Sequence, residues 1–294
     1  MQVFHLPVAP YPEKTVTAIG FFDGVHPAHT ALLQETVRLS KELGAVPALF
    51  TFSSLSSKEC APISTVDDRL SAFAKLGIEA VFIADFASVK DLSPKDFIND
   101  ILCTSCGACA AVCGFNFHFG RGAEGDAAFL KACLPFSSIV PEVKKNGVTV
   151  SSSRIRALLL EGDVGGAADL LGSPYTVRGT VMHGKALGRT LGFPTANIST
   201  PLLLPKNGVY ETRATVNGKS YPAMTDVGNR PTVEGQGERR TETHILGFDG
   251  DLYGKEISVS FLRRLRDEIT FESKDALLKQ LKKDATHIER NLSK

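Results

Sequence analysis

The sequence predicts an α/β domain built on a parallel sheet, followed by an antiparallel β-barrel and a C-terminal helix. Three observations support this prediction. In the first half, short apolar runs alternate with helical patterns, which is typical of a parallel sheet covered on both faces. After residue 172, alternating runs follow one another without helices, as in a small antiparallel barrel. Residues 273–292 then form an amphipathic helical pattern with Ser273 as N-cap.

The expected elements of the first half follow from these patterns. Helices are expected from Pro27 onward and over residues 68–77 and 93–102. Strands are expected at residues 15–23, 47–52, 80–86, 108–115 and 137–143. Ligands of parallel sheets gather at the carboxyl ends of the strands, so the loops that follow the strands are the places to search for chemistry.

The domain boundary is expected at Gly172-Ser173-Pro174, which divides the chain into domains of residues 1–172 and 173–294. A chain of 294 residues is also long enough for two domains. In the second domain, Asn217-Gly218 lies between two alternating runs and predicts a tight hairpin.

Bulk composition excludes several classes of protein. Hydrophobic residues make up 43% and charged residues 22%, and the net charge is +1, which gives no reason to expect nucleic acid as a partner. The first residues lack the basic start and apolar core of a signal peptide, and no apolar run approaches the ~20 residues that span a bilayer. We therefore expect a cytoplasmic protein that acts on small molecules without a membrane, as a monomer or weak homo-oligomer.

The first candidate site is the turn GFFDGVHPAH, residues 20–29, between the first long strand and a helix. His26 is placed at the helix cap and His29 in the first helical turn. Unpaired backbone N–H groups and the helix dipole favour an anion there, and two imidazoles three residues apart add further donors. An isolated H-x-x-H would more often be two surface histidines, but its place after a strand favours a phosphate site.

This turn resembles the G-x-F-D-G-V-H-x-G-H signature of bacterial bifunctional riboflavin kinase/FMN adenylyltransferases. Two further segments resemble the same family: GFNFHFGRGAEGD (114–126) and VSSSRIRALL (150–159). The resemblance implies a Rossmann-like nucleotidyltransferase domain in which His26 and His29 stabilise charge on the transferred AMP phosphate. It implies an ATP and triphosphate site at Gly20, Phe22, Asp23, Gly24, Ser152, Ser153 and Arg156, and a flavin contact at Asn116.

Two departures keep a second interpretation open. Ala28 stands where the family has glycine between the histidines, and the family's T-F-D-P-H-P loop reads TFSSLS here, residues 51–56. The alternative is a riboflavin kinase whose adenylyltransferase domain is weak or inactive.

The second candidate site is the stretch HGKALGRTLGFPTANI, residues 183–198. Glycines let the backbone approach phosphate oxygens, and Thr195 and Asn197 offer neutral oxygens suited to Mg²⁺. The stretch resembles the riboflavin kinase motif G-x-x-x-G-R-x-x-G-x-P-T-A-N-I. The resemblance implies an ATP site at Gly184, Gly188, Arg189 and Pro194, with Mg²⁺ held by Thr195 and Asn197.

The general base of the kinase is implied by the resemblance to be Glu268, which would accept the proton of the ribityl 5′-hydroxyl. Arg266 is implied to contact flavin or phosphate, and Asp226 stands where the family often has asparagine. The predicted function is therefore the conversion of riboflavin and ATP to FMN, and of FMN and ATP to FAD, with Mg²⁺.

Four cysteines raise a third interpretation. They read C-x2-C-x2-C-x3-C over residues 103–113, the spacing of bacterial ferredoxins, which would make the chain a [4Fe–4S] module fused to a flavin-binding domain. However, Cys109 and Cys113 fall on one expected strand, ~13 Å apart, which is too far for one cluster. No second cysteine set exists for the two-cluster arrangement. We therefore expect core cysteines and no iron–sulfur cluster, with Cys103 and Cys106 as the pair to check for metal or thiol chemistry.

Overall fold

The computed structural model describes residues 1–53, 61–183, 192–229 and 239–292. The chain divides into two compact units, Met1–Ser152 and Ser153–Lys294. Each unit has its own sheet and its own buried core, and each is described separately below.

The first unit is built on a six-stranded sheet in the order β1-β4-β3-β2-β5-β8, with every neighbouring pair parallel. The strands are β1 (Gln2–His5), β2 (Thr15–Ile19), β3 (Val46–Phe52), β4 (Ala80–Ala84), β5 (Ala108–Gly114) and β8 (Ser138–Val140). The five strands expected from the sequence are present. The strand β1 was not expected, because its four residues are mostly exposed and carry no clear alternation.

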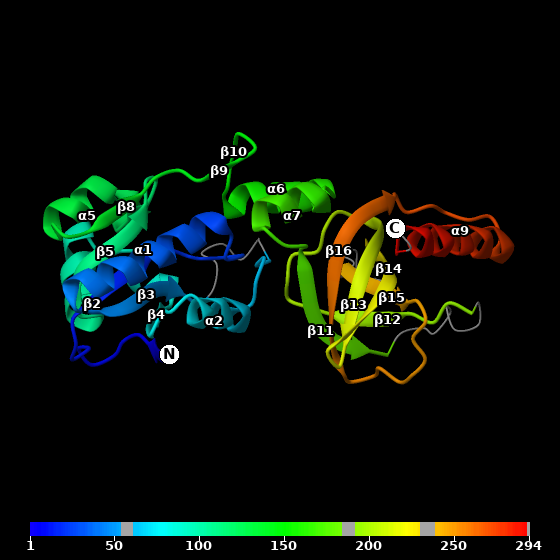
Figure 1. The fold of residues 1–294 in the computed structure, drawn as a ribbon, viewed down its shortest axis with the longest axis horizontal. Helices are drawn as coiled ribbons and strands as arrows, with labels where there is room; N and C mark the ends of the chain where they lie inside the picture. The colour runs from blue at the N-terminus through cyan, green and yellow to red at the C-terminus, as the bar shows by residue number, and fades with distance from the viewer. Residues whose placement is uncertain (54–60, 184–191, 230–238, 293–294) are drawn as a thin grey trace. The chain divides into compact units, whose positions relative to one another are not determined.

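Helices cover both faces of this sheet (Figure 1). They are α1 (Pro27–Leu43), α2 (Val66–Lys75), α3 (Phe86–Val89), α4 (Pro94–Asp96), the π-helical η1 (Phe97–Ser105) and α5 (Ala127–Cys133). One face packs against Leu33 of α1 and Phe73 of α2, and the other against Leu102 of η1 and Leu130 of α5. The predicted parallel α/β domain is confirmed.

The expected helix over residues 93–102 has an unexpected form. It begins as one turn of α-helix at Pro94 and continues as the π-helix η1. The hydroxyls of Thr104 and Ser105 each donate to the carbonyl five residues earlier, at 2.8 Å. These side chains help to satisfy carbonyls in the widened turns, a feature that apolar periodicity does not reveal.

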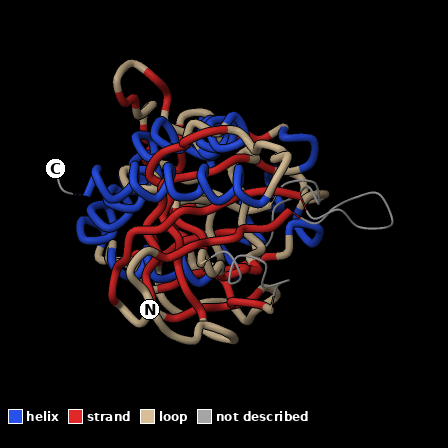
Figure 2. The backbone as a smooth tube through the Cα atoms, turned by 90° about the vertical axis from the view of Figure 1, so that its right-hand side faces the viewer, coloured by secondary structure: helices blue, strands red, loops and turns tan. Residues whose placement is uncertain are grey.

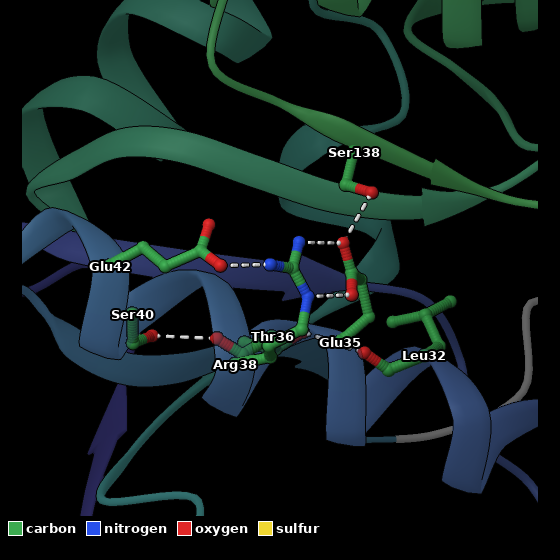
Figure 3. Close-up of polar contacts among 7 residues, drawn as sticks. All are labelled: Leu32, Glu35, Thr36, Arg38, Ser40, Glu42 and Ser138. Carbon is green, nitrogen blue, oxygen red and sulfur yellow. Dashed lines mark hydrogen bonds and ion pairs between the residues drawn. The ribbon is translucent and has the colours of Figure 1, made fainter.

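Smaller elements complete the first unit. Strands β6 (His118–Phe119) and β7 (Gly125–Asp126) pair around the 3-10 turn η2 (Arg121–Ala123). A hairpin of β9 (Lys144–Lys145) and β10 (Val148–Thr149) projects from this unit as an arm (Figures 1 and 2). Glu35 of α1 accepts a hydrogen bond from Ser138 of β8 and pairs with Arg38, which ties the helix to the edge strand (Figure 3).

The second unit is a closed barrel in the order β11-β12-β15-β14-β13-β16, with all pairs antiparallel. Its strands are β11 (Thr176–Met182), β12 (Ala196–Ser199), β13 (Gly208–Val216), β14 (Lys219–Asn229), β15 (Arg239–Ile245) and β16 (Glu256–Arg266). The hairpin between β13 and β14 turns at Asn217 (φ 49°) and Gly218 (φ 77°), the left-handed pair of a type I′ turn. The predicted barrel and hairpin are confirmed.

Three helices flank the barrel in sequence: α6 (Ser152–Glu161), α7 (Val164–Leu171) and α9 (Lys274–Leu292). The hydroxyl of Ser273 accepts from the N–H of Ala276 at 3.2 Å, as expected of its N-cap role. Ile288 of α9 packs against Val209 and Met224 of the barrel. The structural division after Ser152 groups α6 and α7 with the barrel, whereas the boundary predicted at residue 172 follows them.

Candidate active sites

The turn that follows β2 lies at the point where the order of the sheet reverses. The strand β2 has β3 on one side and β5 on the other, so the connections from this point run in opposite directions. Such a switch point opens a crevice at the carboxyl ends of the strands, where ligands bind. The predicted residues Gly20, Phe22, Asp23, Gly24, His26 and His29 all belong to this one turn and to the start of α1.

The backbone of this turn adopts conformations that few residues occupy. Phe22 has φ 56° and Val25 has φ 34°, both in the left-handed region. The Phe22 side chain is fully buried, and its ring lies 5.6 Å from the ring of Phe73 and 5.1 Å from that of His29, centroid to centroid. Phe22 is thus a packing residue that holds the strained turn, and its side chain is not free to contact ATP.

Asp23 anchors the turn to the segment before α2. Its carboxylate, only 2% exposed, accepts hydrogen bonds from the N–H groups of Ile63 and Ser64 at 2.9–3.0 Å. The hydroxyl of Ser64 donates to the same carboxylate at 3.1 Å and accepts from the N–H of Gly24 at 2.8 Å. The Asp23 carboxylate is therefore stabilised by amides of a neighbouring loop. These hydrogen bonds reduce the repulsion between its negative charge and a phosphate bound at the turn.

The two histidines are in contact with each other. His26 is the N-cap of α1, and its Nδ1 accepts from the backbone N–H of His29 at 3.4 Å. The rings stack with centroids 3.7 Å apart and planes 14° apart. Nε2 of His26 lies 3.3 Å from Oγ of Ser152, which itself donates to the carbonyl of Asp23 at 2.8 Å. The structure thus places Ser152 next to His26, and both residues were predicted to belong to the same site.

Burial keeps both imidazoles neutral. It lowers the pKa of His26 to about 4, although the nearby Asp23 carboxylate acts in the opposite direction. The pKa of His29 is held well below the ordinary histidine value, first by burial and then by the positive charges of His26 and Arg69. At neutral pH each ring is therefore a neutral donor rather than a cation.

Arg69 of α2 is a feature of this site that the sequence gave no reason to select. Its side chain is 4% exposed and donates to the carbonyls of Phe21 at 2.9 Å and of Phe52 at 3.3 Å. Its guanidinium also lies 5.2 Å from the centre of the Phe21 ring. Arg69 thus links the loops that leave β2 and β3 at the carboxyl edge of the sheet.

The remaining predicted residues of this site lie at two further places. Asn116 is exposed in the turn that follows β5, the neighbour of β2. Ser153 and Arg156 follow Ser152 on α6, whose residues from Ser153 onward belong to the second unit. Ala28, which stands where the family has glycine, is half-buried in the first turn of α1. Residues 54–56, in the loop that differs from the family's T-F-D-P-H-P, lie outside the described residues.

In the second unit, two cavities of about 300 Å³ each meet at Thr195, which lines both of them. The first, here called the carboxylate cavity, is lined by Thr195, Val209, Met224, Asp226, Glu242, His244, Arg266, Glu268, Ile269, Phe271, Leu277 and Leu281. The second, here called the aromatic cavity, is lined by Val181, Pro194, Thr195, Ala196, Thr243, Ile245, Phe248, Asp249, Gly250, Asp251, Leu252 and Tyr253. One predicted metal ligand therefore lies between two spaces, each of a size suited to a small molecule.

Glu268 faces the carboxylate cavity after the last strand of the barrel. Its Oε2 accepts from the side-chain amide of Asn207 at 3.2 Å. A Cβ atom on Gly228 would lie 2.5 Å from Oε1 of Glu268, so a side chain at residue 228 would displace the carboxylate. Sequence reasoning did not select Asn207, and it gave no sign that residue 228 lies against Glu268.

Two further carboxylates line the same cavity. The pKa of Asp226 is raised to about 6, first by burial and then by the charges of Glu268 and Glu242, against the opposing effect of Arg266 and Arg240. Glu242 is paired with Arg240 at 2.7 Å and lies 3.5 Å from the hydroxyl of Thr195, which donates to it. The cavity therefore concentrates negative charge around Glu268.

Arg266 joins the last strand of the barrel to α9. Two of its nitrogens lie 2.9 Å from Oδ2 of Asp284 on α9, and a third donates to the carbonyl of Asp267 at 3.1 Å. Arg266 lines the carboxylate cavity, but each of its three nitrogens already contacts a protein oxygen, and two of these contacts join β16 to α9. A contact with flavin or phosphate stays a prediction.

The predicted metal and ATP residues of the second unit are only partly described. Thr195 directly precedes β12, and Asn197 lies on it two residues later, on the same side of the strand. Pro194 lines the aromatic cavity, and its carbonyl accepts from Nδ1 of His244 at 2.8 Å. Gly184, Gly188 and Arg189 lie outside the described residues. Among the described residues, no group of three His, Cys, Asp or Glu side chains is arranged to hold a metal ion.

The cysteines lie in the core of the first unit. Cys106 and Cys113 are fully buried on the face of the sheet that packs against η1 and α5, and burial raises the pKa of Cys113 to about 11. Cys109 donates from its thiol to the carbonyl of Thr15 at 3.3 Å. These side chains lie along a strand and at the end of a helix, where cysteine packs as a small hydrophobic residue. Cys103 is half-buried beside the same core, with a pKa raised by burial.

Comparison with known proteins identifies a family for each unit. A family model described as FAD synthetase matches residues 8–154, and one described as riboflavin kinase matches residues 171–292. The bifunctional riboflavin kinase/FMN adenylyltransferases of Listeria monocytogenes and Bacillus subtilis are each 33% identical, covering 92% of this chain and 90% of theirs. The chain belongs to this bifunctional family. The predicted family and the predicted enzymatic function are confirmed, and the kinase-only and iron–sulfur interpretations are disfavoured.

A solved structure supports the same architecture over both units of this family member. The structure, described as a macrolide-efflux protein from Streptococcus pneumoniae, has a TM-score of 0.88 and 30% identity, and the match covers 98% of this chain and 99% of that one. In the described part of this chain, no helix is both long and apolar enough to cross a membrane.

Proposed function

We propose that the first unit transfers AMP from ATP to FMN at the His26–His29 turn, and that the second unit phosphorylates riboflavin at Glu268. The observation that supports this division most strongly is the contrast in chemistry between the two places. The turn offers neutral hydrogen-bond donors at a helix N-terminus. The carboxylate cavity offers Glu268 as a base, and its wall includes Thr195, a predicted metal ligand.

In the first unit, the acceptor of the AMP group is the phosphate of FMN. A phosphate oxygen is already ionised at neutral pH, so the reaction needs no general base, only alignment and stabilisation of negative charge. His26 and His29 would donate to oxygens of the α-phosphate from the start of α1, where unpaired N–H groups also point outward. Ser152 would orient His26, while Ser153 and Arg156 would hold the leaving pyrophosphate and Asn116 would contact the flavin.

In the second unit, the acceptor is a hydroxyl, which must lose its proton. Glu268 would accept that proton from the ribityl 5′-hydroxyl as the γ-phosphoryl group of ATP is transferred. Riboflavin would occupy the carboxylate cavity, whose apolar side is made by Met224, Ile269 and Leu281. ATP would occupy the aromatic cavity, so that the two substrates meet at Thr195.

The donor set at this meeting point fits Mg²⁺, which binds few protein oxygens and completes its shell with water and substrate phosphates. Thr195 and Asn197 would hold the ion through neutral oxygens, with the Glu242 carboxylate 3.5 Å from the Thr195 hydroxyl. When bound, the ion would neutralise charge on the ATP phosphates. We further propose that the enzyme acts in the cytoplasm on small molecules, without nucleic acid, as a monomer or weak homo-oligomer.

An assay with two substrates tests this proposal. Purified full-length protein is incubated with Mg-ATP and either riboflavin or FMN, and the flavins are separated by chromatography. We expect FMN and then FAD from riboflavin, and FAD from added FMN. Products that stop at FMN, with added FMN left unconverted, would contradict adenylylation and leave a kinase with an inactive first unit.

A further inference from the structure

The kinase reaction changes the charge of the flavin. Riboflavin is uncharged at neutral pH, whereas FMN carries a phosphate monoester of about −1.5 to −2 charges. In the proposed function, this phosphate forms on the ribityl 5′-oxygen whose proton Glu268 accepts, so it forms beside the Glu268 carboxylate. Negative groups close to Glu268 therefore repel the product much more than the substrate.

Asp226 of β14 is such a group. A Cβ atom on Gly228 would lie 2.5 Å from Oε1 of Glu268 and 3.7 Å from Oδ2 of Asp226. Oxygens of the two carboxylates thus lie within 4 Å of one point beside the backbone, and both residues line the carboxylate cavity. A phosphate that forms next to Glu268 is therefore also close to the charge of Asp226.

Strand register places a third carboxylate beside the same residue. Glu242 of β15 is directly opposite Asp226 in the pairing of β14 with β15, and it lines the same cavity. Opposite residues of antiparallel strands have Cβ atoms ~4.5–5.5 Å apart, and like charges at such positions are destabilising. Asparagine, which the family often has in place of Asp226, would avoid this repulsion. A destabilising charge at this position favours a functional explanation.

The arginines whose charges act on Asp226 are engaged with other carboxylates. Arg240 pairs with Glu242 at 2.7 Å, and Arg266 pairs with Asp284 of α9 at 2.9 Å. Each of these cations is therefore partly compensated by its own partner, so the wall of the cavity around Asp226 keeps a negative character.

Asp226 changes its charge within an accessible range of pH. Its pKa is raised to about 6, first by burial and then by Glu268 and Glu242. His244 also lines the cavity, and its Nδ1 contacts the carbonyl of Pro194. The Asp226 carboxylate is therefore mostly ionised at about pH 7.5 and mostly protonated at about pH 5.

We propose that Asp226 is a specificity-determining residue of the kinase site, whose negative charge weakens the binding of FMN relative to riboflavin and so favours release of the product. The proposal rests on the proposed phosphorylation of riboflavin at Glu268. A neutral substrate enters the cavity without this repulsion, and the repulsion arises only once the phosphoryl group has been transferred.

Inhibition of the kinase step by FMN tests the proposal. The full-length protein phosphorylates labelled riboflavin with Mg-ATP, unlabelled FMN is the competitor, and initial rates of total labelled FMN and FAD give Ki for FMN and KM for riboflavin. At about pH 7.5 we expect Asp226→Asn to lower Ki roughly tenfold, with a smaller change in KM.

The pH dependence separates the charge of Asp226 from a structural role. At about pH 5, where Asp226 is protonated, the wild type and Asp226→Asn should have similar Ki values for FMN. The phosphate of FMN also gains a proton in this range, but equally for both proteins. Equal Ki values at about pH 7.5, or the same difference at both pH values, would overturn the proposal.

Two further variants complete the test. Asp226→Glu keeps the charge and should leave FMN a weak inhibitor at about pH 7.5, and a Ki as low as in Asp226→Asn would contradict the proposal. Glu256→Gln, the matched control, removes an exposed carboxylate at the other end of β16 from Arg266 and should leave Ki unchanged.

The result is distinguishable from failure of the proposed function. A wild-type protein that does not phosphorylate riboflavin would contradict the proposed kinase activity, and this proposal with it. An active kinase whose Ki for FMN does not respond to Asp226→Asn would overturn this proposal alone.

Discussion

The two candidate sites treat charge in opposite ways. At the turn after β2, the carboxylate of Asp23 is bound by amides of residues 63 and 64, and the histidines are kept neutral by burial. In the barrel, three carboxylates line one cavity, and the pKa of Asp226 is raised, first by burial and then by the other two carboxylates. The difference matches the two acceptors. The phosphate of FMN needs hydrogen-bond donors and no base, whereas the hydroxyl of riboflavin needs a base. The two steps of FAD synthesis therefore require one site of each kind.

The largest expected effect comes from removing the base. Glu268→Gln keeps the size of the side chain and its contact with Asn207 but cannot accept a proton. We expect kcat for riboflavin phosphorylation to fall ~10²–10⁴-fold, and FMN adenylylation to be unchanged, in assays that supply riboflavin or FMN separately. Equal losses of both activities in a folded variant would remove the distinction between the sites.

The reciprocal change is His29→Ala. It removes one neutral donor from the turn and should lower kcat for FMN adenylylation by ~10²–10³-fold while FMN still forms from riboflavin. Stopped assays with flavin chromatography measure both steps in one sample. Retained FAD synthesis would show that the turn does not carry the reaction.

The pH dependence of stability sharpens the comparison. His26 has a folded pKa of about 4, below its unfolded value near 6.5, so the contribution of this group is present above pH ~6.5 and is lost as the pH falls towards 4. Asp226 has a folded pKa of about 6, above its unfolded value near 3.9, so its contribution is present below pH ~3.9 and is lost as the pH rises through 6. The contribution is at most about 3–4 kcal/mol for His26 and about 3 kcal/mol for Asp226.

Chemical denaturation of the free protein at several pH values tests these signs. Asp226→Asn should make the free energy of unfolding fall less, or rise more, between pH 4 and 6 than in the wild type. His26→Gln should remove stabilisation gained over the same range. A change of the opposite sign in either variant would show that the burial described here does not govern that group.

The smallest effect is expected far from both sites. Ser138→Ala removes one hydrogen bond to Glu35, whose carboxylate is already paired with Arg38 on α1 (Figure 3). The free energy of unfolding should change by no more than about 1 kcal/mol, because partly exposed pairs contribute little, and both activities should be unchanged. A large loss of either activity would indicate that the edge strand β8 influences catalysis.

The sequence predicted the two architectures and most of their strands because the signals for these are local. Alternation of strands and helices predicted the parallel sheet, and Asn217-Gly218 fixed a hairpin, since each depends on neighbours in the chain. The strand β1 and the π-helix η1 were missed because pairing at a sheet edge and widened turns leave no periodic trace.

The supporting residues of the sites were beyond sequence reasoning for a related reason. Arg69 donates to a carbonyl 48 residues earlier in the chain, and Asn207 and Gly228 lie near Glu268 only through the closure of the barrel. Asp23 was predicted as a phosphate-site residue, but its side chain is engaged with loop amides. Only the packed structure brings these groups together, because they come from segments far apart in the chain.

The most direct test of two independent sites is complementation between the two inactive variants. His29→Ala and Glu268→Gln are mixed in equal amounts with riboflavin and Mg-ATP, and FAD is measured against each variant alone. We expect FMN from the first variant to be converted by the second, so that FAD appears only in the mixture. A mixture that forms FMN but no FAD, with both variants folded, would contradict the account.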